Sequence, residues 1–177
     1  MPSDIKAYLE IEELVDDSKY REAYEKLELL GDSEVDKAEW HRRCAEVCYL
    51  ISNTQDKDQE RVYWLRRGRK HALDGHEQNP TSIAFLKILC STTGRLAEES
   101  GVIDKINLGF KFKTYLDRAI AVDPSSLELL HMRGRFSYEK IRPGVTENRL
   151  YIGRVLYAKG DYTAAKKWLA KVRVATC

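Results

Sequence analysis

Residues that interrupt helices are scarce in this sequence, which has 4 Pro and 10 Gly among 177 residues. No Asn-Gly or Asp-Gly turn lies between alternating apolar runs, so the usual signal of a β-hairpin is absent. Apolar residues recur instead at intervals of three and four, as in Tyr20, Tyr24 and Leu27. These features predict an all-α protein. Asp17-Ser18 separates the first two helices and is expected to provide the N-cap of the second.

The net charge is also small, and the sequence has no long apolar run. The 30 basic and 28 acidic residues leave a net charge of +2, which gives no overall attraction to nucleic acid. No apolar run approaches the roughly 18–20 residues of a membrane span, and the first ten residues lack the pattern of a signal peptide. The four cysteines show no spacing typical of a disulfide framework. We therefore expect a cytoplasmic protein with no nucleic-acid partner.

Enzymatic motifs are missing. The sequence has no Gly-rich phosphate loop, no His-Glu-x-x-His and no Gly-x-Ser-x-Gly. His41, Cys44 and Cys48 fall on adjacent turns of one expected helix, where a metal site is conceivable. Without a second pair of ligands they would form an incomplete zinc shell, and small cysteines often pack between helices. We expect no catalysis, no metal and no cofactor.

The carboxy-terminal stretch indicates the architecture. Gly153, Gly160, Tyr162 and Ala165 fit positions 8, 15, 17 and 20 of the 34-residue tetratricopeptide pattern. Weaker helix pairs precede it, at 40–48 with 62–73 and at 80–99 with 105–122, and the polar stretch 52–60 reads as an insertion. The sequence predicts one domain over residues 1–177. Its antiparallel helix hairpins would stack as a tetratricopeptide-like superhelix of about nine helices.

One irregularity interrupts this pattern. Gly134 and Gly153 would both occupy position 8, yet they are 19 residues apart and not 34. A second-type helix is therefore missing or abbreviated near residues 140–143, where Ile141-Arg142-Pro143-Gly144 would join two first-type helices directly.

The concave surface of such a stack is lined by first-type helices. The assigned register places an Arg one turn before a Tyr in two of them. Arg can grip a carboxylate while a Tyr ring packs on a peptide or acyl stem, so a peptide partner in the groove is one interpretation. The alternative is that these arginines pair with Glu128, Glu147 or solvent. The candidate groove residues are His131, Arg135, Tyr138, Arg154 and Tyr157.

A basic helix over residues 61–73 supplies the second candidate surface. Its apolar side chains gather on one side of a helical wheel, and Arg66, Arg67 and Lys70 point away from them together with Tyr63. These cations could meet an acidic partner such as tubulin. The alternative is a solvated face that keeps the protein soluble.

The residues of two segments also resemble a known family. The stretch 109–139 is similar to the GFxFKxxxDKAIxLxP segment and following GRxxY helix of the regulator of microtubule dynamics family, and LYIGRVLYAKGDYTAAKKWL at 150–169 is similar as well. The sequence lacks the segment that the family usually has between Glu139 and Arg142. The matching residues of the first segment are Phe110, Phe112, Lys113, Asp117, Ala119, Ile120, Pro124, Gly134, Arg135 and Tyr138.

This resemblance implies a function. It implies a non-enzymatic adaptor associated with microtubules, acting in microtubule dynamics, spindle function and chromosome segregation. Its partners would be tubulin or a spindle-associated protein, and its location would be the cytoskeleton, including the spindle and its poles. Some relatives handle lipid at organelle contacts, so the alternative function is lipid binding, lipid transfer or tethering at such sites.

Overall fold

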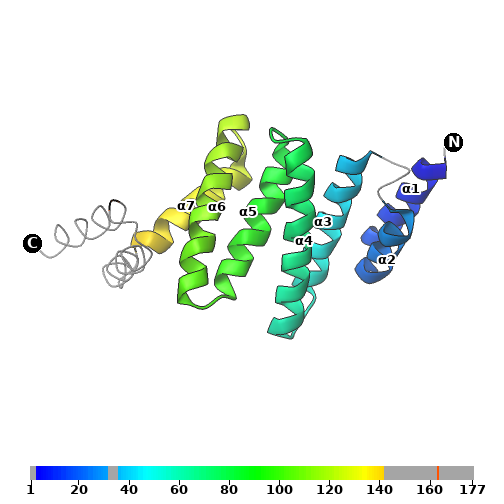
Figure 1. Cartoon of the computed structure of the whole chain (residues 1–177), viewed down its shortest axis with the longest axis horizontal. Helices are drawn as coiled ribbons and strands as arrows, with labels where there is room; N and C mark the ends of the chain where they lie inside the picture. Colours follow the sequence, from blue (N-terminus) through cyan, green and yellow to red (C-terminus); the bar gives the residue numbers. More distant parts are fainter. Residues whose placement is uncertain (1–2, 32–35, 142–162, 164–177) are drawn as a thin grey trace, which may run out of the picture. The chain divides into compact units, whose positions relative to one another are not determined.

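The structure, a computed structural model, describes residues 3–31, 36–141 and 163 (Figure 1). Every regular element in these residues is a helix, which confirms the all-α prediction. About nine helices were expected; those in residues 142–177 lie outside the described part, so the count stays a prediction. The helices that the structure describes are α1 (Ser3–Asp16), α2 (Tyr20–Leu30), α3 (Lys37–Asn53), α4 (Asp58–Gln78), α5 (Ile83–Glu98), α6 (Val102–Val122) and α7 (Leu127–Ile141).

The chain divides into two compact units, Met1–Ser126 and Leu127–Cys177. In the first unit, consecutive helices pack on one another from α1 to α6, and α5 also contacts α3. Figure 1 shows α3, α4, α5 and α6 side by side. The expected helix pairs are therefore present as α1–α2, α3–α4 and α5–α6. In the second unit α7 contains the expected first-type helix around Gly134, and the irregularity after residue 141 lies outside the described residues.

The turn between α1 and α2 differs from the expected N-cap. Ser18 has φ 61°, in the left-handed region that favours glycine. The Ser18 amide donates to the Val15 carbonyl oxygen at 3.0 Å, and the Lys19 amide donates to the Leu14 carbonyl oxygen at 2.8 Å. This pair of bonds is a Schellman motif, which ends α1. Ser18 therefore terminates the first helix, and the residue preceding α2 is Lys19, which makes no side-chain cap.

The break between helices in the polar stretch 52–60 is shorter than the sequence predicts. Helix α3 continues to Asn53 and α4 begins at Asp58, so only residues 54–57 connect them. Ser52 is buried, and its hydroxyl donates to the Tyr49 carbonyl oxygen at 2.6 Å. Local hydrogen bonds of this kind let a polar residue remain inside a helix. The expected insertion is thus largely helical.

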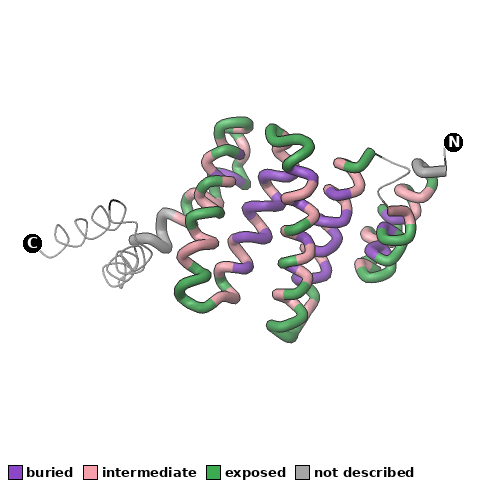
Figure 2. Tube along the Cα trace, viewed as in Figure 1, coloured by how far each residue is buried: buried purple, intermediate pink, exposed green. Residues whose placement is uncertain are grey.

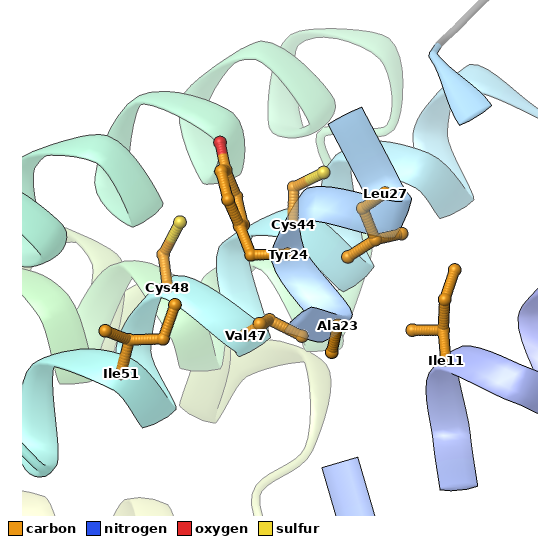
Figure 3. Packing of buried hydrophobic residues seen from close by; sticks show 8 residues of the cluster. All are labelled: Ile11, Ala23, Tyr24, Leu27, Cys44, Val47, Cys48 and Ile51. Carbon is orange, nitrogen blue, oxygen red and sulfur yellow. The ribbon is translucent and has the colours of Figure 1, made fainter. Parts of the chain in front are cut away.

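Buried side chains concentrate on α3 and α5, which lie between other helices (Figure 2). One apolar cluster joins α1, α2 and α3, and a second joins α3, α4 and α5. Among the described residues, no helix is both long enough and apolar enough to cross a bilayer. The first cluster, shown in Figure 3, consists of Ile11, Ala23, Tyr24, Leu27, Cys44, Val47, Cys48 and Ile51.

Two glycines allow α4 to approach its neighbours closely. A Cβ at Gly68 would lie 2.9 Å from the Cys48 Cβ and 3.1 Å from the Ala45 carbonyl oxygen. A Cβ at Gly75 would lie 2.3 Å from the Phe85 ring. Both positions are too close for any larger residue, so the packing of α4 on α3 and α5 depends on them.

We predict that Gly75→Ala destabilises the protein by about 1–3 kcal/mol, because the added methyl overpacks against the buried Phe85 ring. Gly109→Ala is the matched control, since no atom lies within 4 Å of a Cβ built there. Alanine in the helix interior at Gly109 should stabilise by up to about 1 kcal/mol. Urea unfolding followed by circular dichroism measures both, and equal stability of the two variants would contradict the packing argument.

Candidate partner-binding surface on helix α4

Helix α4 is amphipathic. Its apolar residues recur at intervals of three and four, and this spacing determines which side chains meet solvent. Leu65, Gly68 and Ala72 are buried against neighbouring helices. Arg66 and Lys70, one turn apart on the opposite side, are exposed. In the described part of the chain neither has an acidic group within ion-pair distance. Arg66 and Lys70 thus form a cationic ridge on α4.

Arg67 differs from its neighbour Arg66. Its guanidinium turns toward α2, where Nε donates to the Tyr24 hydroxyl at 2.6 Å and a terminal nitrogen forms an ion pair with Glu28. A second terminal nitrogen donates to the Tyr63 hydroxyl at 2.8 Å. These bonds hold the pKa of Arg67 above its ordinary value. The wheel prediction that Arg67 points away from the packed face is therefore wrong, because a long side chain at the edge of the face reaches the next helix.

The bond from Arg67 begins a chain of hydrogen bonds through the first unit. Tyr24 Oη lies 3.1 Å from His71 Nε2, and His71 Nδ1 lies 3.3 Å from His41 Nδ1. Arg67 can only donate, so the Tyr24 oxygen accepts from it. When His71 carries its proton on Nδ1, its Nε2 can accept from the Tyr24 hydroxyl and its Nδ1 can donate to His41.

Aromatic rings enclose the chain and keep it partly dry. The Trp40 ring stands edge-on to His71 at 5.2 Å between centroids, and Trp64 stands edge-on to Tyr24 at the same distance. Figure 3 shows the Tyr24 hydroxyl pointing away from the apolar side chains of the cluster. Burial raises the pKa of Tyr24 well above its usual range. The same effect, together with the charge of Arg67, lowers the pKa of His71 to about 4.

The three residues once considered as metal ligands have other environments. His41 contacts His71, as described above, while Cys44 and Cys48 are free thiols in the first apolar cluster. Burial raises the pKa of both thiols, that of Cys48 to about 12. A buried thiol with a raised pKa is a poor nucleophile and metal ligand. Within the described residues, no group of three or more His, Cys, Asp or Glu is arranged to hold a metal ion.

The candidate groove residues fall in the second unit. His131 and Arg135 are exposed on α7, one turn apart. Tyr138 belongs to the same helix, but its side chain lies outside the described residues, as do Arg154 and Tyr157 entirely. The structure thus leaves Arg66 and Lys70 together on the exposed side of α4 and turns Arg67 toward α2, and the binding role of all the candidate residues stays a prediction.

The comparisons with known proteins bear on this surface. The family model described as Regulator of microtubule dynamics protein 1-3 matches residues 7–141. The chain belongs to the regulator of microtubule dynamics family. This confirms the resemblance seen in the sequence. All the candidate residues on α4 and α7 lie within the matched range.

This chain is moderately similar to individual members of the regulator of microtubule dynamics family. The chain is 33% identical over 96 residues to Regulator of microtubule dynamics protein 1 of Caenorhabditis elegans, covering 54% of this chain and 42% of that protein. It is 26% identical to protein 3 of Xenopus laevis over 111 residues, covering 61% and 22%. It is 30% identical to protein 3 of Bos taurus over 100 residues, covering 55% and 20%. The matched part therefore spans less than half of each of these relatives.

For this member of the regulator of microtubule dynamics family, sequence reasoning missed Tyr24 and His71. Both looked like ordinary residues of amphipathic helices, and their contact joins positions 47 residues apart. One signal was present: Arg67 and His71 are four residues apart, which places them on the same side of α4. That spacing indicates a shared polar edge, although it does not identify the partner helix.

We predict that Arg67→Leu destabilises the protein by about 2 kcal/mol, because it leaves Tyr24 and Glu28 without their cationic donor. The neighbouring Arg66→Leu removes the same charge from an exposed position and should change stability by less than about 0.5 kcal/mol. Thermal and urea unfolding of the two variants provide the measurement. Similar losses from both would show that Arg67 does not tether α2 to α4.

We further predict that stability falls as the pH is lowered from 7.5 to 5. The folded pKa of His71 is about 4 and its unfolded value is about 6.5, so the unfolded chain binds the proton first. Stability is complete above about pH 6.5 and is lost toward pH 4, by about 1–2 kcal/mol at pH 5 after allowance for solvent screening.

Unfolding in urea at several pH values checks this expectation. The His71→Gln variant should lose most of the pH dependence, because glutamine can accept from Tyr24 without titrating. Part of the dependence should remain, since burial and then the charge of Arg118 also lower the pKa of His76. The exposed His131→Gln variant is the control and should behave like the wild type. An unchanged slope in His71→Gln would contradict the assignment.

Proposed function

We propose that this chain is a non-enzymatic, microtubule-associated adaptor that regulates microtubule dynamics through the cationic ridge of α4. The observation that carries the proposal is the exposed pair Arg66 and Lys70, which has no acidic partner within the described residues. The names of the relatives, which describe regulation of microtubule dynamics, supply the biological setting. The surface of tubulin is the acidic partner that this chemistry fits.

The contrast among the cations of α4 supports the proposal. Arg61 pairs with Glu99, and Arg69 donates to Thr93 and lies beside α6 through Tyr115. These two arginines, like Arg67, hold helices together. Only the ridge cations are left to solvent in the described part of the helix.

The ridge also has an unfavourable internal interaction. Arg66 and Lys70 are four residues apart, and like charges at this spacing repel by a few tenths of a kcal/mol in an isolated helix. An acidic partner would relieve this repulsion on binding. The half-exposed Tyr63 ring, with 53% of its surface accessible, adjoins the ridge and offers an apolar contact of the kind enriched at interfaces.

The finer parts of the proposed function have less direct support. A tetratricopeptide-like superhelix is supported, within the first unit, by the contact of α5 with both α3 and α4, as stacked hairpins require. One domain over residues 1–177 stays a prediction. A peptide in the groove would meet His131 and Arg135 on α7. Roles at the spindle and in chromosome segregation follow from the family resemblance alone, and the lipid-handling alternative stays a prediction.

Co-sedimentation with polymerised tubulin at low salt tests the ridge. We expect Arg66→Glu/Lys70→Glu to bind about tenfold more weakly, because two attractive contacts become repulsive. The matched control is Lys105→Glu/Lys111→Glu, which makes the same charge change at two exposed positions of α6. Arg67 is left intact in both, so that the contact of α2 with α4 is preserved.

The outcomes separate the parts of the proposal. Equal loss in the ridge variant and the α6 control would show that only total charge matters. If the ridge variant binds as well as the wild type, the ridge is not the binding surface. If the wild type does not sediment with microtubules even at low salt, the chain does not contact tubulin directly. Binding that falls steadily as salt is added is expected of exposed charges.

A further inference from the structure

Partly buried polar groups meet where α2 packs on α3 and α4. Arg67 and His71 of α4 both reach the Tyr24 hydroxyl of α2. Trp40 of α3 donates from Nε1 to the Leu27 carbonyl oxygen of α2 at 2.8 Å. These five residues form a contact that we call the polar seam. Because its bonds need particular protonation states, the attachment of α2 depends on the charge of the groups in the seam.

The other contacts that attach the α1–α2 pair are apolar packing and exposed ion pairs. Ala23, Tyr24 and Leu27 of α2 pack in the first apolar cluster together with side chains of α3. Arg21 of α2 pairs with Glu60 of α4, and about half of each side chain is exposed. An exposed ion pair contributes little to stability. When the polar seam is weakened, the pair is therefore held chiefly by apolar packing.

Helices α3, α4 and α5 are joined mainly by close apolar contact. Gly68 lets α4 lie directly against Cys48 and Ala45 of α3, and Gly75 lies against the Phe85 ring of α5. The second apolar cluster joins the same three helices. Packing of this kind does not depend on the protonation state of a histidine. The polar seam therefore marks the place where acid can separate one part of the first unit from the rest.

His71 is the group of the seam whose charge changes in mild acid. Burial first, and then the charges of Arg67 and Lys70, hold its pKa at about 4, below the ordinary value of about 6.5. The charge of Asp74 acts in the opposite direction. In the described residues, the titratable and charged groups that face His71 are Tyr24 of α2, His41 of α3, and Arg67, Lys70 and Asp74 of α4.

Protonation of His71 acts on α2 in particular. When the neutral ring carries its proton on Nδ1, the added proton goes to Nε2, the nitrogen that faces Tyr24. The Tyr24 oxygen, which already accepts from Arg67, would then face a second donor. The bond from Nδ1 toward His41 of α3 is unchanged by this proton. Moving α2 away, and not α3, therefore gives the new charge access to water.

We propose that the α1–α2 pair is an acid-released element, which detaches when His71 is protonated while α3, α4, α5 and α6 stay packed. Local opening of this kind is common where one contact is weaker than its neighbours. Release uncovers Cys44 and Cys48 of α3, which lie with Tyr24 and Leu27 of α2 in the first apolar cluster (Figure 3). The opening equilibrium should rise about tenfold from pH 7.5 to pH 5, because the open state binds the proton more readily.

Alkylation by N-ethylmaleimide at several pH values measures the opening. The rate at each cysteine is followed by peptide mass spectrometry and divided by that of a cysteine-containing peptide at the same pH, which removes the pH dependence of the reagent. These normalised rates at Cys44 and Cys48 should be about tenfold higher at pH 5 than at pH 7.5. Cys90, which is buried on α5, should react more slowly than both at every pH.

Three variants identify the trigger. In His71→Gln the rise in acid should be lost, because glutamine can accept from Tyr24 without titrating. The matched control is His76→Gln, which removes a second buried histidine of α4 that is not part of the polar seam and should keep the rise. Tyr24→Phe should speed labelling of both thiols at pH 7.5 by about fivefold or more, because Arg67 and His71 lose their shared partner.

Two results would overturn the proposal. A single normalised rate for Cys44, Cys48 and Cys90 would mean that the whole unit unfolds together and that the α1–α2 pair is not released separately. A rate at the first two thiols that does not change with pH, or that rises equally in His71→Gln, would mean that His71 is not the trigger. A variant that fails to fold is recognised by rapid labelling of Cys90, and the three thiols of the wild type still decide whether the pair is released.

Discussion

The hydrogen bond from Arg67 to Tyr24 is the interaction that orders the polar interior of the first unit. A guanidinium has no lone pair to accept with, so the Tyr24 oxygen accepts in this bond and keeps its own proton for another acceptor. The Nδ1–H tautomer of His71 accepts that proton's hydrogen bond at Nε2 and donates to His41. A donor on α4 is thereby linked to polar groups on α2 and α3.

The same constraint explains why acid should affect this region. A proton added to His71 would occupy the nitrogen that accepts from Tyr24, and the phenol would lose its acceptor. The new positive charge would also face Arg67, which cannot release its proton. Burial, and with it the charge of Arg67, favour neutral His71, which is the physical origin of its lowered pKa.

Much of the fold could be predicted because periodicity sums over many residues. The pairs α3–α4 and α5–α6 appear in the sequence as long apolar repeats, and the structure contains them. The turn at Ser18 could not be predicted in the same way. Its left-handed backbone is stabilised by amides bonding to Leu14 and Val15, and a serine there is equally consistent with an N-cap. Local hydrogen-bond geometry decided between the two.

The candidate site shows the same limit more sharply. Arg66 and Arg67 are adjacent and chemically identical, and a helical wheel places both away from the apolar side of α4. Their roles differ because a rotation of about 100° brings only Arg67 within reach of α2. That distinction depends on the position of a neighbouring helix, which is a tertiary property. The exposed pair Arg66 and Lys70 could be identified from the sequence, whereas Arg67 could be assigned only from its contacts.

A buried polar chain is an uncommon way to join helices, since apolar packing costs less desolvation. The second cluster, formed by Ala45, Ala72, Phe85, Ile88 and Leu89, relies on apolar packing alone. Apolar contact tolerates small rotations of one helix on another, because it has little directional preference. Hydrogen bonds at 2.6–3.3 Å between Arg67, Tyr24, His71 and His41 do not. The polar chain therefore specifies how α2 is oriented on α3 and α4.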